Sequence, residues 1–212
     1  MTELLTINPN KPEEDLINRA ARILKNGGVI GYPTETVYGI GCNIYHSDAV
    51  SRIYQIKKRR HNKAFILIVA DSLQVQDIAA EIPESAEKLM ENFWPGPLTL
   101  VLKASKSLQQ TEFHRVSTIA VRIPDCAICL ALLKSSGFPI VSTSANLSGL
   151  AAATTAPQVL SLFGPTLDLV IDGGKTPGTI PSTIVDVTQN PVKIEREGAI
   201  SKLEINTVLE TV

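Results

Sequence analysis

Residues 138–149 read Phe138-Pro-Ile-Val-Ser142-Thr-Ser-Ala-Asn146-Leu-Ser-Gly149, so that a short apolar run breaks abruptly into small hydroxyl and amide side chains. The apolar part suits a buried strand of a parallel or mixed sheet, and open α/β sheets bind ligands just beyond the carboxyl ends of such strands. We therefore expect a strand over 139–141 and, after it, a polar loop that holds a small polar molecule. A Ser- and Thr-rich turn that only caps the next segment would give the same pattern.

A second segment repeats this order of strand, polar turn and glycine. Pro33-Thr34-Glu-Thr-Val-Tyr38-Gly39-Ile-Gly41 follows an apolar run at 29–32. Two such strand ends in one sheet can face each other across a cleft, and glycine permits close approaches that a Cβ would block. Because strand, turn and glycine often follow one another for structural reasons alone, that interpretation stays open.

Positive charge is concentrated in one segment of a chain whose net charge is −1. Six Lys and Arg and no acid lie between residues 52 and 63, which leaves 14 of the 20 basic residues against 21 Asp and Glu elsewhere. A local cluster suits one phosphate-bearing ligand better than a long nucleic-acid track. A solvated helix end is the structural alternative.

Arg122 stands in an otherwise apolar run with Ile119, Val121 and Ile123. A charge in such a strand must be paired or must face a polar cavity, because burying it alone costs too much. The planar guanidinium suits a carboxylate or a phosphate of a ligand. A structural salt bridge is the alternative.

Hydrophobic periodicity predicts helices and strands that interleave along the chain. Helices are expected at 13–26, 47–56 with Ser47 as N-cap, 72–80, 84–93, 127–135, 157–163 and 201–210, and strands at 29–32, 65–70, 98–102, 118–123, 139–141, 167–172, 183–187 and 192–195. This order means an α/β protein, and its runs of consecutive strands favour a mixed sheet. No repeat or shift of composition divides the chain, so we expect one domain over 1–212.

The sequence shows no motif for a metal site, a membrane span, secretion or a P-loop. Cys126 and Cys129 form the one CxxC pair, and the three histidines lie far apart, so we expect buried thiols on one helix face and no metal site. No apolar run of about 18 residues occurs, which predicts no membrane contact. The first residues lack a secretory signal, so a cytoplasmic location is expected. No Walker A loop is present, which excludes a P-loop enzyme.

Seven segments carry a family resemblance in order along nearly the whole chain. They are Gly28–Gly41, Lys57-x-Arg59 with Lys63, Trp94–Thr99, Ile119–Pro124, Ser142-x-Ser144-x-Asn146, Pro181–Asp186 and Arg196–Gly198. Together they resemble the YrdC-like threonylcarbamoyl-AMP synthase family, single-domain type. The resemblance implies a twisted α/β fold with a large concave cavity. It also implies a nucleotidyltransferase that joins L-threonine, bicarbonate and ATP into L-threonylcarbamoyl-AMP, releases pyrophosphate, and so serves the threonylcarbamoyladenosine modification of tRNA.

The same resemblance assigns the site residues. Thr34, Arg122, Ser142 and Ser182 would hold L-threonine, with Arg122 on its carboxylate. Lys57, Arg59, Lys63, Thr118, Ser144, Asn146 and Arg196 would hold ATP, and Lys57, Arg59 and Ser144 would form the catalytic set. Mg²⁺ is implied with ATP, and downstream threonylcarbamoyl-transferase machinery is the implied partner; contact with tRNA or double-stranded RNA is left open.

Two other functions stay in view. An RNA-binding or ribosome-associated module could use the same basic concavity, although a net charge of −1 and 5% aromatic residues count against it. A paralogue of the YciO type would share the fold without efficient synthase activity. The intact Ser142-x-Ser144-x-Asn146 segment argues against that paralogue.

Overall fold

A computed structural model describes residues 2–58, 65–113, 116–147 and 149–210. The strands are β1 (Glu3–Thr6), β2 (Ile30–Tyr32), β3 (Gly39–Asn43), β4 (Ile66–Ile68), β5 (Leu98–Lys103), β6 (Thr118–Arg122), β7 (Ile140–Ser144), β8 (Leu169–Asp172), β9 (Thr183–Asp186) and β10 (Lys193–Arg196). The helices are α1 (Glu14–Lys25), α2 (Ser47–Ile56), α3 (Ser72–Ile78), α4 (Glu84–Phe93), α5 (Ala127–Ser136), α6 (Ala156–Phe163) and α7 (Lys202–Glu210), with short 3₁₀ turns η1 (Lys106–Gln110) and η2 (Gly164–Thr166).

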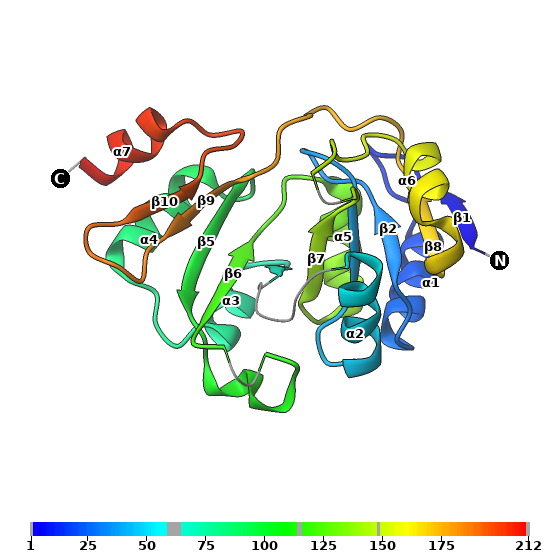
Figure 1. Ribbon diagram of the computed structural model, residues 1–212, viewed down its shortest axis with the longest axis horizontal. Coiled ribbons are helices and arrows are strands. Elements are labelled where there is room, and N and C mark those ends of the chain that lie inside the picture. Colours follow the sequence, from blue (N-terminus) through cyan, green and yellow to red (C-terminus); the bar gives the residue numbers. More distant parts are fainter. Residues whose placement is uncertain (1, 59–64, 114–115, 148, 211–212) are drawn as a thin grey trace.

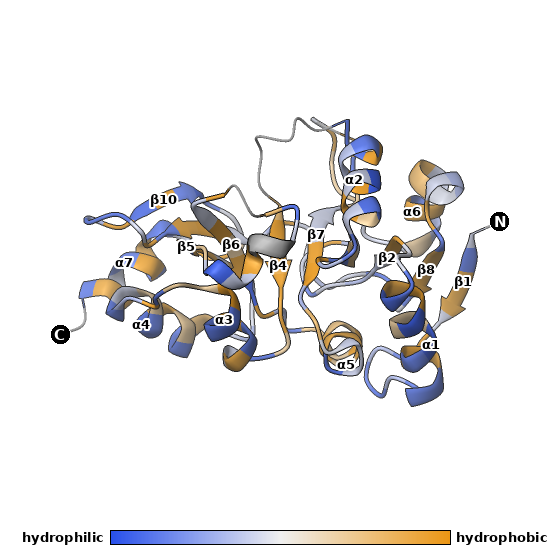
Figure 2. Ribbon diagram, turned by 90° about the horizontal axis from the view of Figure 1, so that it is seen from below, coloured by the Kyte–Doolittle hydropathy of each residue, from blue (hydrophilic) through white to orange (hydrophobic). Residues whose placement is uncertain are grey.

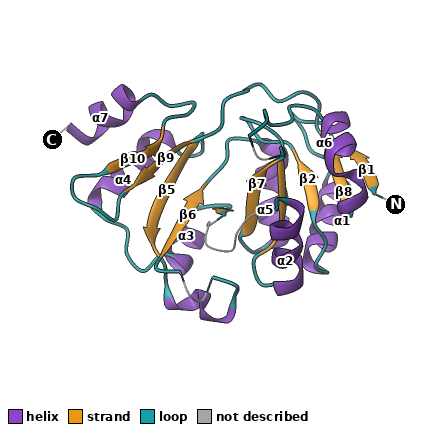
Figure 3. Ribbon diagram, in the orientation of Figure 1, coloured by secondary structure: helices purple, strands orange, loops and turns teal. Residues whose placement is uncertain are grey.

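The described strands form one mixed sheet in the order β1-β8-β2-β3-β7-β4-β6-β5-β9-β10 (Figure 1). Four neighbouring pairs are parallel, namely β1 with β8, β2 with β8, β4 with β6, and β5 with β9. The other neighbours run antiparallel. Helices and loops surround the sheet, as Figure 3 shows, so the expected α/β class with a mixed sheet is confirmed.

Two apolar cores lie against the sheet. One gathers Ile17, Ala20 and Leu24 of α1 with Ile128 and Leu132 of α5. The larger one gathers buried side chains of α2, α3, α4 and α6. Figure 2 shows α2 and α5 on opposite sides of the sheet and colours most of its central strands as apolar. Covering both faces explains why these strands are continuous apolar runs.

The predicted helices are confirmed within a few residues at each end. One helix cap differs from the prediction, and two strands were not predicted. The N-cap of α2 is His46, and Ser47 is the first helical residue. Strand β1 was not predicted, because only one of its four residues is buried and its apolar signal is short. Strand β3 was also missed, because its glycines suggested a turn although all its residues are buried.

The prediction that a polar loop begins after residue 141 is wrong, because residues 142–144 belong to a strand. Strand β7 continues through Ser142 and Thr143 to Ser144. Val141 and Thr143 are buried whereas Ser142 and Ser144 are half-buried, so the two serines lie on one face of the strand. The polar side chains therefore belong to the sheet itself. Among the described residues no helix is long and apolar enough to span a membrane.

Candidate functional site

A cavity of about 170 Å³ opens on the face of the sheet that carries the two serines. In one row across four strands, Gly41 pairs with Ser142, Ser142 with Ile66, and Ile66 with Ala120. Residues two apart on a strand point to the same face, so the neighbouring rows add further lining residues. These are Gly39, Ser144, Ile68 and Arg122. The site thus lies on a sheet face, and β7 is antiparallel to both neighbours, so it does not lie beyond a parallel strand end as predicted.

Six of the predicted site residues line this one cavity. They are Thr34, Arg122, Ser142, Ser144, Ser182 and Arg196, which come from the turn after β2 and from β6, β7, β10 and the residue before β9. The expected meeting of the segments around Thr34 and Ser142 across a cleft is therefore confirmed. Ligand pockets for drug-sized molecules usually measure roughly 300–1,000 Å³, so the described walls suit a smaller molecule.

Arg122 is 6% exposed and is held on several sides. Its Nε donates to the carbonyl of Gly96 at 3.0 Å, in the turn that Trp94 begins. Its Nη2 forms a salt bridge with Glu35. Long contacts of 3.4 and 3.5 Å join both Nη atoms to Thr36 Oγ1. The structural salt bridge considered from the sequence is therefore present, and Arg122 nevertheless lines the cavity.

Glu35 was not predicted as a site residue. Its Oε2 is buried and, within the described part of the chain, has no hydrogen-bond partner. Its backbone carbonyl accepts a hydrogen bond from Gly178 N at 3.0 Å, which ties the 173–182 loop to this turn. An acidic residue between two threonines after a buried strand was the available sequence signal, because a buried acid is rarely found without a cation.

A second guanidinium, that of Arg196, lines the same cavity. Arg196 Nε and Nη2 donate to the carbonyl of Ser182 at 3.2 and 2.7 Å. Partial burial, reinforced by the positive charge of Arg122, lowers the pKa of Arg196. Ser182 is itself buried, and its hydroxyl shares a hydrogen bond of 2.8 Å with Thr99. Two guanidinium groups close enough to interact in the lining of one small cavity favour an anionic ligand.

Thr34 organises the turn that carries Glu35. Its hydroxyl oxygen accepts from the backbone N–H groups of Thr36 and Val37, each at 3.2 Å, and donates to the Val37 carbonyl at 2.7 Å. Such side-chain to backbone bonds fix a tight turn. The hydroxyl is thus engaged within the turn, even though Thr34 lines the cavity.

Lys57, Ser144 and Asn146 meet beside the cavity. The Lys57 ammonium is buried, and it donates to the Ser144 carbonyl at 2.7 Å, to Asn146 Oδ1 at 2.9 Å and to the Asn146 carbonyl. It also lies 5.9 Å from the centre of the Phe163 ring. Ser144 Oγ donates to Asn146 Oδ1 at 2.7 Å. The structure therefore places Lys57 as a support for the 144–146 segment, outside the lining of the cavity.

One other predicted residue that the structure describes, Thr118, is not among the residues that line this cavity. Thr118 begins β6 and pairs with Lys103 of β5, which places it beyond the residues that line the cavity. Arg59 and Lys63 lie outside the described residues. The apolar part of the lining, from Ile66, Ile68 and Ala120, was not predicted, because apolar strand residues carry no sign of a site.

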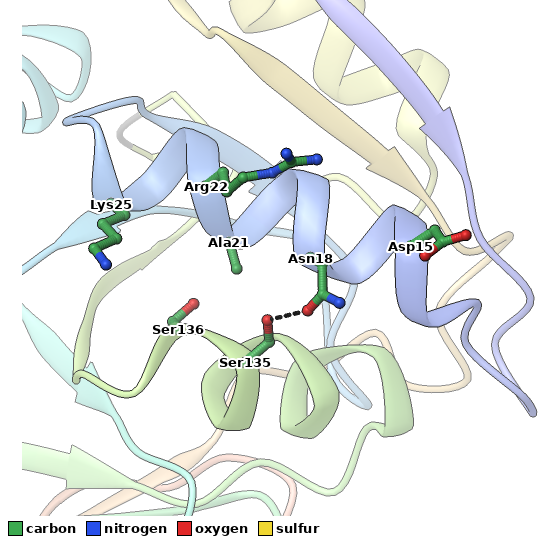
Figure 4. A pocket seen from close by; sticks show the side chains of 7 residues that line it. All are labelled: Asp15, Asn18, Ala21, Arg22, Lys25, Ser135 and Ser136. Atoms are coloured by element: carbon green, nitrogen blue, oxygen red, sulfur yellow. Dashed lines mark hydrogen bonds between the residues drawn. The ribbon is translucent and has the colours of Figure 1, made fainter.

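A larger cavity of about 570 Å³ lies between α1 and α5 (Figure 4). It is lined by Asp15, Asn18, Ala21, Arg22, Lys25, Ser135 and Ser136. Ser135 Oγ donates to Asn18 Oδ1 at 2.7 Å across the groove. None of these seven residues was predicted for the site, and Arg22 and Lys25 occupy the last turn of α1, where the helix dipole favours cations.

All three cysteines are free thiols. Cys129 is buried, as expected, and Cys42 is buried as well. Cys126, which was expected to be buried on the same helix face, is only partly buried and is the N-cap of α5. Burial raises the pKa of all three thiols. Within the described ranges no group of three His, Cys, Asp or Glu could hold a metal ion.

Comparison with known sequences decides the family. The sequence model of the Sua5/YciO/YrdC family, which carries the description telomere recombination, matches residues 22–198. The chain belongs to this family. The resemblance seen in the seven sequence segments is thereby confirmed.

Two members of the Sua5/YciO/YrdC family that match most of the chain are named threonylcarbamoyl-AMP synthase. A threonylcarbamoyl-AMP synthase of Pyrococcus abyssi is 38% identical over 209 residues, which cover 99% of this chain and 61% of that protein. Another, from Nitrosococcus oceani, is 41% identical over 172 residues, which cover 80% of this chain and 92% of that protein. The chain thus spans about three fifths of the length of the Pyrococcus relative.

Solved structures of the family agree with the fold. The crystal structure of P. abyssi Sua5 complexed with L-threonine matches with a TM-score of 0.93 at 37% identity, covering 100% of this chain and 62% of that one. The crystal structure of Escherichia coli YciO matches with a TM-score of 0.87 at 31% identity, covering 97% and 99%.

Proposed function

We propose that this chain is an L-threonylcarbamoyladenylate synthase, which converts L-threonine, bicarbonate and ATP into threonylcarbamoyl-AMP and pyrophosphate. The observation that carries the proposal is the pair of guanidinium groups, Arg122 and Arg196, in one small cavity with the hydroxyl of Ser142. A cavity with these groups suits the carboxylate of a small polar amino acid. Two family relatives named threonylcarbamoyl-AMP synthase, and the Sua5 complex with L-threonine, support this choice of substrate.

In this proposal Arg122 holds the carboxylate of threonine. The salt bridge with Glu35 uses Nη2, so Nη1 keeps donors for a ligand besides its long contact with Thr36. Ser142 and Ser182 supply hydroxyl groups at the same cavity. Thr34 contributes by fixing the turn that carries Glu35.

ATP would bind on the side of Ser144 and Arg196, next to the segment that Lys57 supports. The basic residues Arg59 and Lys63 follow Lys57 in the sequence, so they are the candidates for the phosphates. Mg²⁺ would arrive with ATP, because magnesium in such sites is held largely by phosphates and water. Of the residues that the structure describes, none that lines the cavity is a carboxylate, so the chain offers the ion no cage of its own.

The chemistry needs no nucleophilic side chain. The threonine amine captures carbon dioxide derived from bicarbonate and becomes a carbamate. A carbamate oxygen then attacks the α-phosphorus of ATP, and pyrophosphate leaves. Reactions of this class depend on positioning and on neutralising charge, which cations around a small cavity can provide. The product would pass to the machinery that modifies tRNA.

A second candidate function is that of a YciO-type protein without efficient synthase activity. The E. coli YciO sequence is 33% identical to the chain over 200 residues, and those residues cover 93% of this chain and 96% of that protein. Because the two sequences match over nearly their whole lengths, the YciO-type function remains the second candidate. The network of Lys57, Ser144 and Asn146 favours the synthase, because it organises the segment where a nucleotide would bind.

One assay tests the proposal. The purified chain is mixed with ATP, MgCl₂ and bicarbonate, with and without L-threonine, and pyrophosphate is followed. Release that requires both threonine and bicarbonate is the expected result. Pyrophosphate release that is equally fast without threonine would refute the proposal. If calorimetry shows threonine binding but no pyrophosphate is released, the result would support the YciO-type candidate.

A further inference from the structure

Tyr32 reaches Ser142 across an intervening strand. Tyr32 belongs to β2 and Ser142 to β7, and β3 lies between these strands in the sheet. Even so, the Tyr32 hydroxyl donates to Ser142 Oγ at 2.6 Å. Tyr32 pairs with Gly39 of β3, and Ser142 pairs with Gly41 of β3. The phenol ring therefore extends over the two glycines.

The glycines leave the space that the ring fills. A Cβ on Gly41 would lie 2.9 Å from Tyr32 Cε1, and a Cβ on Gly39 would lie 3.2 Å from Tyr32 Cζ. The first distance is closer than real Cβ contacts, so a larger residue at position 41 would displace the ring. This explains why glycine occupies both positions in a strand whose residues are all buried.

The ring is fixed and its hydroxyl stays protonated. Tyr32 is fully buried within the core that α1 and α5 cover. Burial raises the pKa of Tyr32 well above its ordinary value, so the phenol remains a neutral donor over the working pH range.

The hydrogen bond from Tyr32 determines what the hydroxyl hydrogen of Ser142 can do. A serine hydroxyl accepts through its lone pairs and donates one hydrogen. Because Tyr32 supplies the hydrogen between the two oxygens, Ser142 keeps its own. Within the described part of the chain, no acceptor for that hydrogen is found, and Ser142 lines the cavity.

We propose that Tyr32 is a positioning residue that fixes Ser142 as a hydrogen-bond donor toward an oxygen of the amino-acid substrate. The inference rests on the proposed function of this cavity. Arg122 and Arg196 also act only as donors, so a third fixed donor makes the cavity selective for a ligand that presents several acceptor oxygens.

The test compares Tyr32→Phe with the wild-type chain. Calorimetry first measures threonine binding to wild type, and failure there refutes the proposed function itself. In Tyr32→Phe, which keeps the ring, we expect the threonine Kd and KM to rise about three- to tenfold, with the ATP KM and kcat at saturating threonine changed less than about twofold. Tyr45→Phe, at an exposed tyrosine, is the matched control and should bind like wild type.

A double-mutant cycle shows whether Tyr32 acts through Ser142. Tyr32→Phe should add nothing to the defect of Ser142→Ala. The inference would be overturned if folded Tyr32→Phe bound threonine as wild type does. It would also be overturned if Tyr32→Phe weakened threonine binding by the same factor in the wild-type chain and in Ser142→Ala. If Tyr32→Phe fails to fold, Gly39→Ala replaces it, since its Cβ pushes on the ring without removing the hydroxyl. Gly39→Ala should weaken threonine binding in the same direction, and wild-type affinity in this variant would also refute the inference.

Discussion

Arg122 Nη2 donates to the carboxylate of Glu35, and the two side chains are only 7% and 13% exposed. The same guanidinium also donates to the Gly96 carbonyl through Nε and lines the cavity. A buried pair of this kind is costly to break from one side, because the remaining charge loses its partner.

Glu35→Gln should therefore destabilise the fold. We expect the free energy of unfolding to fall by about 3 kcal/mol, since the neutral amide leaves the Arg122 charge uncompensated. Urea unfolding followed by circular dichroism measures this change. Glu81→Gln breaks the exposed pair of Glu81 with Lys103 and should change stability by less than about 1 kcal/mol. Equal effects of the two substitutions would contradict a buried structural pair.

Arg122→Lys should separate threonine binding from ATP binding. Lysine keeps a positive charge beside Glu35 but loses the planar fork that can hold two carboxylates at once. We expect the threonine Kd to rise at least about tenfold and the ATP Kd to change less than about twofold, as measured by calorimetry. Equal losses for both ligands would reject the role of Arg122 on the threonine carboxylate.

Lys57→Met should impair the segment from Ser144 to Asn146. The substitution keeps an unbranched apolar side chain but removes the donor to two carbonyl groups and one side-chain oxygen. We expect a loss of about 2–3 kcal/mol in the free energy of unfolding and a larger rise in the KM for ATP than in that for threonine. Lys103→Met, at an exposed lysine, is the control for removal of a positive charge. A stable Lys57→Met with normal kinetics would show that this network is dispensable.

Alkaline pH should destabilise the protein. Burial raises the pKa of Cys42, Cys129 and Tyr32, so these groups stay neutral in the fold but ionise near pH 9–10 in the unfolded chain. Their contribution is complete below about pH 8. It is lost as the pH rises above about 9 for the two thiols and above about 10 for Tyr32, at about 1.4 kcal/mol per pH unit for each group. Urea unfolding at several pH values measures the slope. Cys42→Ala should reduce it, and an unchanged slope would refute this assignment.

Lys58→Gly should stabilise the chain. Lys58 follows the C-cap of α2 and has a φ of 47°, in the left-handed region that side chains with a Cβ adopt at a cost. Glycine removes that cost, so we expect the free energy of unfolding to rise by up to about 1 kcal/mol. Arg22→Gly, at an exposed position inside α1, should instead lower it by a similar amount. A loss of stability in Lys58→Gly would mean that the lysine side chain stabilises this turn.

The sequence predicted most of the fold because hydrophobic periodicity is strong in this chain. Helices such as α1 and α4, and strands such as β5 and β6, fall within a few residues of the predicted ranges. Strand β3 was missed for a reason that the structure explains. Its glycines indicate a turn by local propensity, but they are required because the Tyr32 ring lies over them. Such a contact between strands is not visible in local sequence.

The site shows the same limit. Arg122 could be predicted to line a polar cavity or to form a salt bridge, and it does both. The position of Ser142 and Ser144 within a strand could not be predicted, because hydroxyl residues are as common in turns as in exposed strand faces. The role of Lys57 was also out of reach, since three acceptors from a distant segment surround its ammonium only in the folded state.

The order of strands has a consequence for how the protein folds. The cavity floor pairs β3 with β7 and β4 with β6, whose partners lie far apart along the chain. Sheets built from such distant pairings have high contact order and fold slowly. The cavity floor therefore forms only when strands about 50 to 100 residues apart have paired, because no short stretch of the chain contains the whole floor.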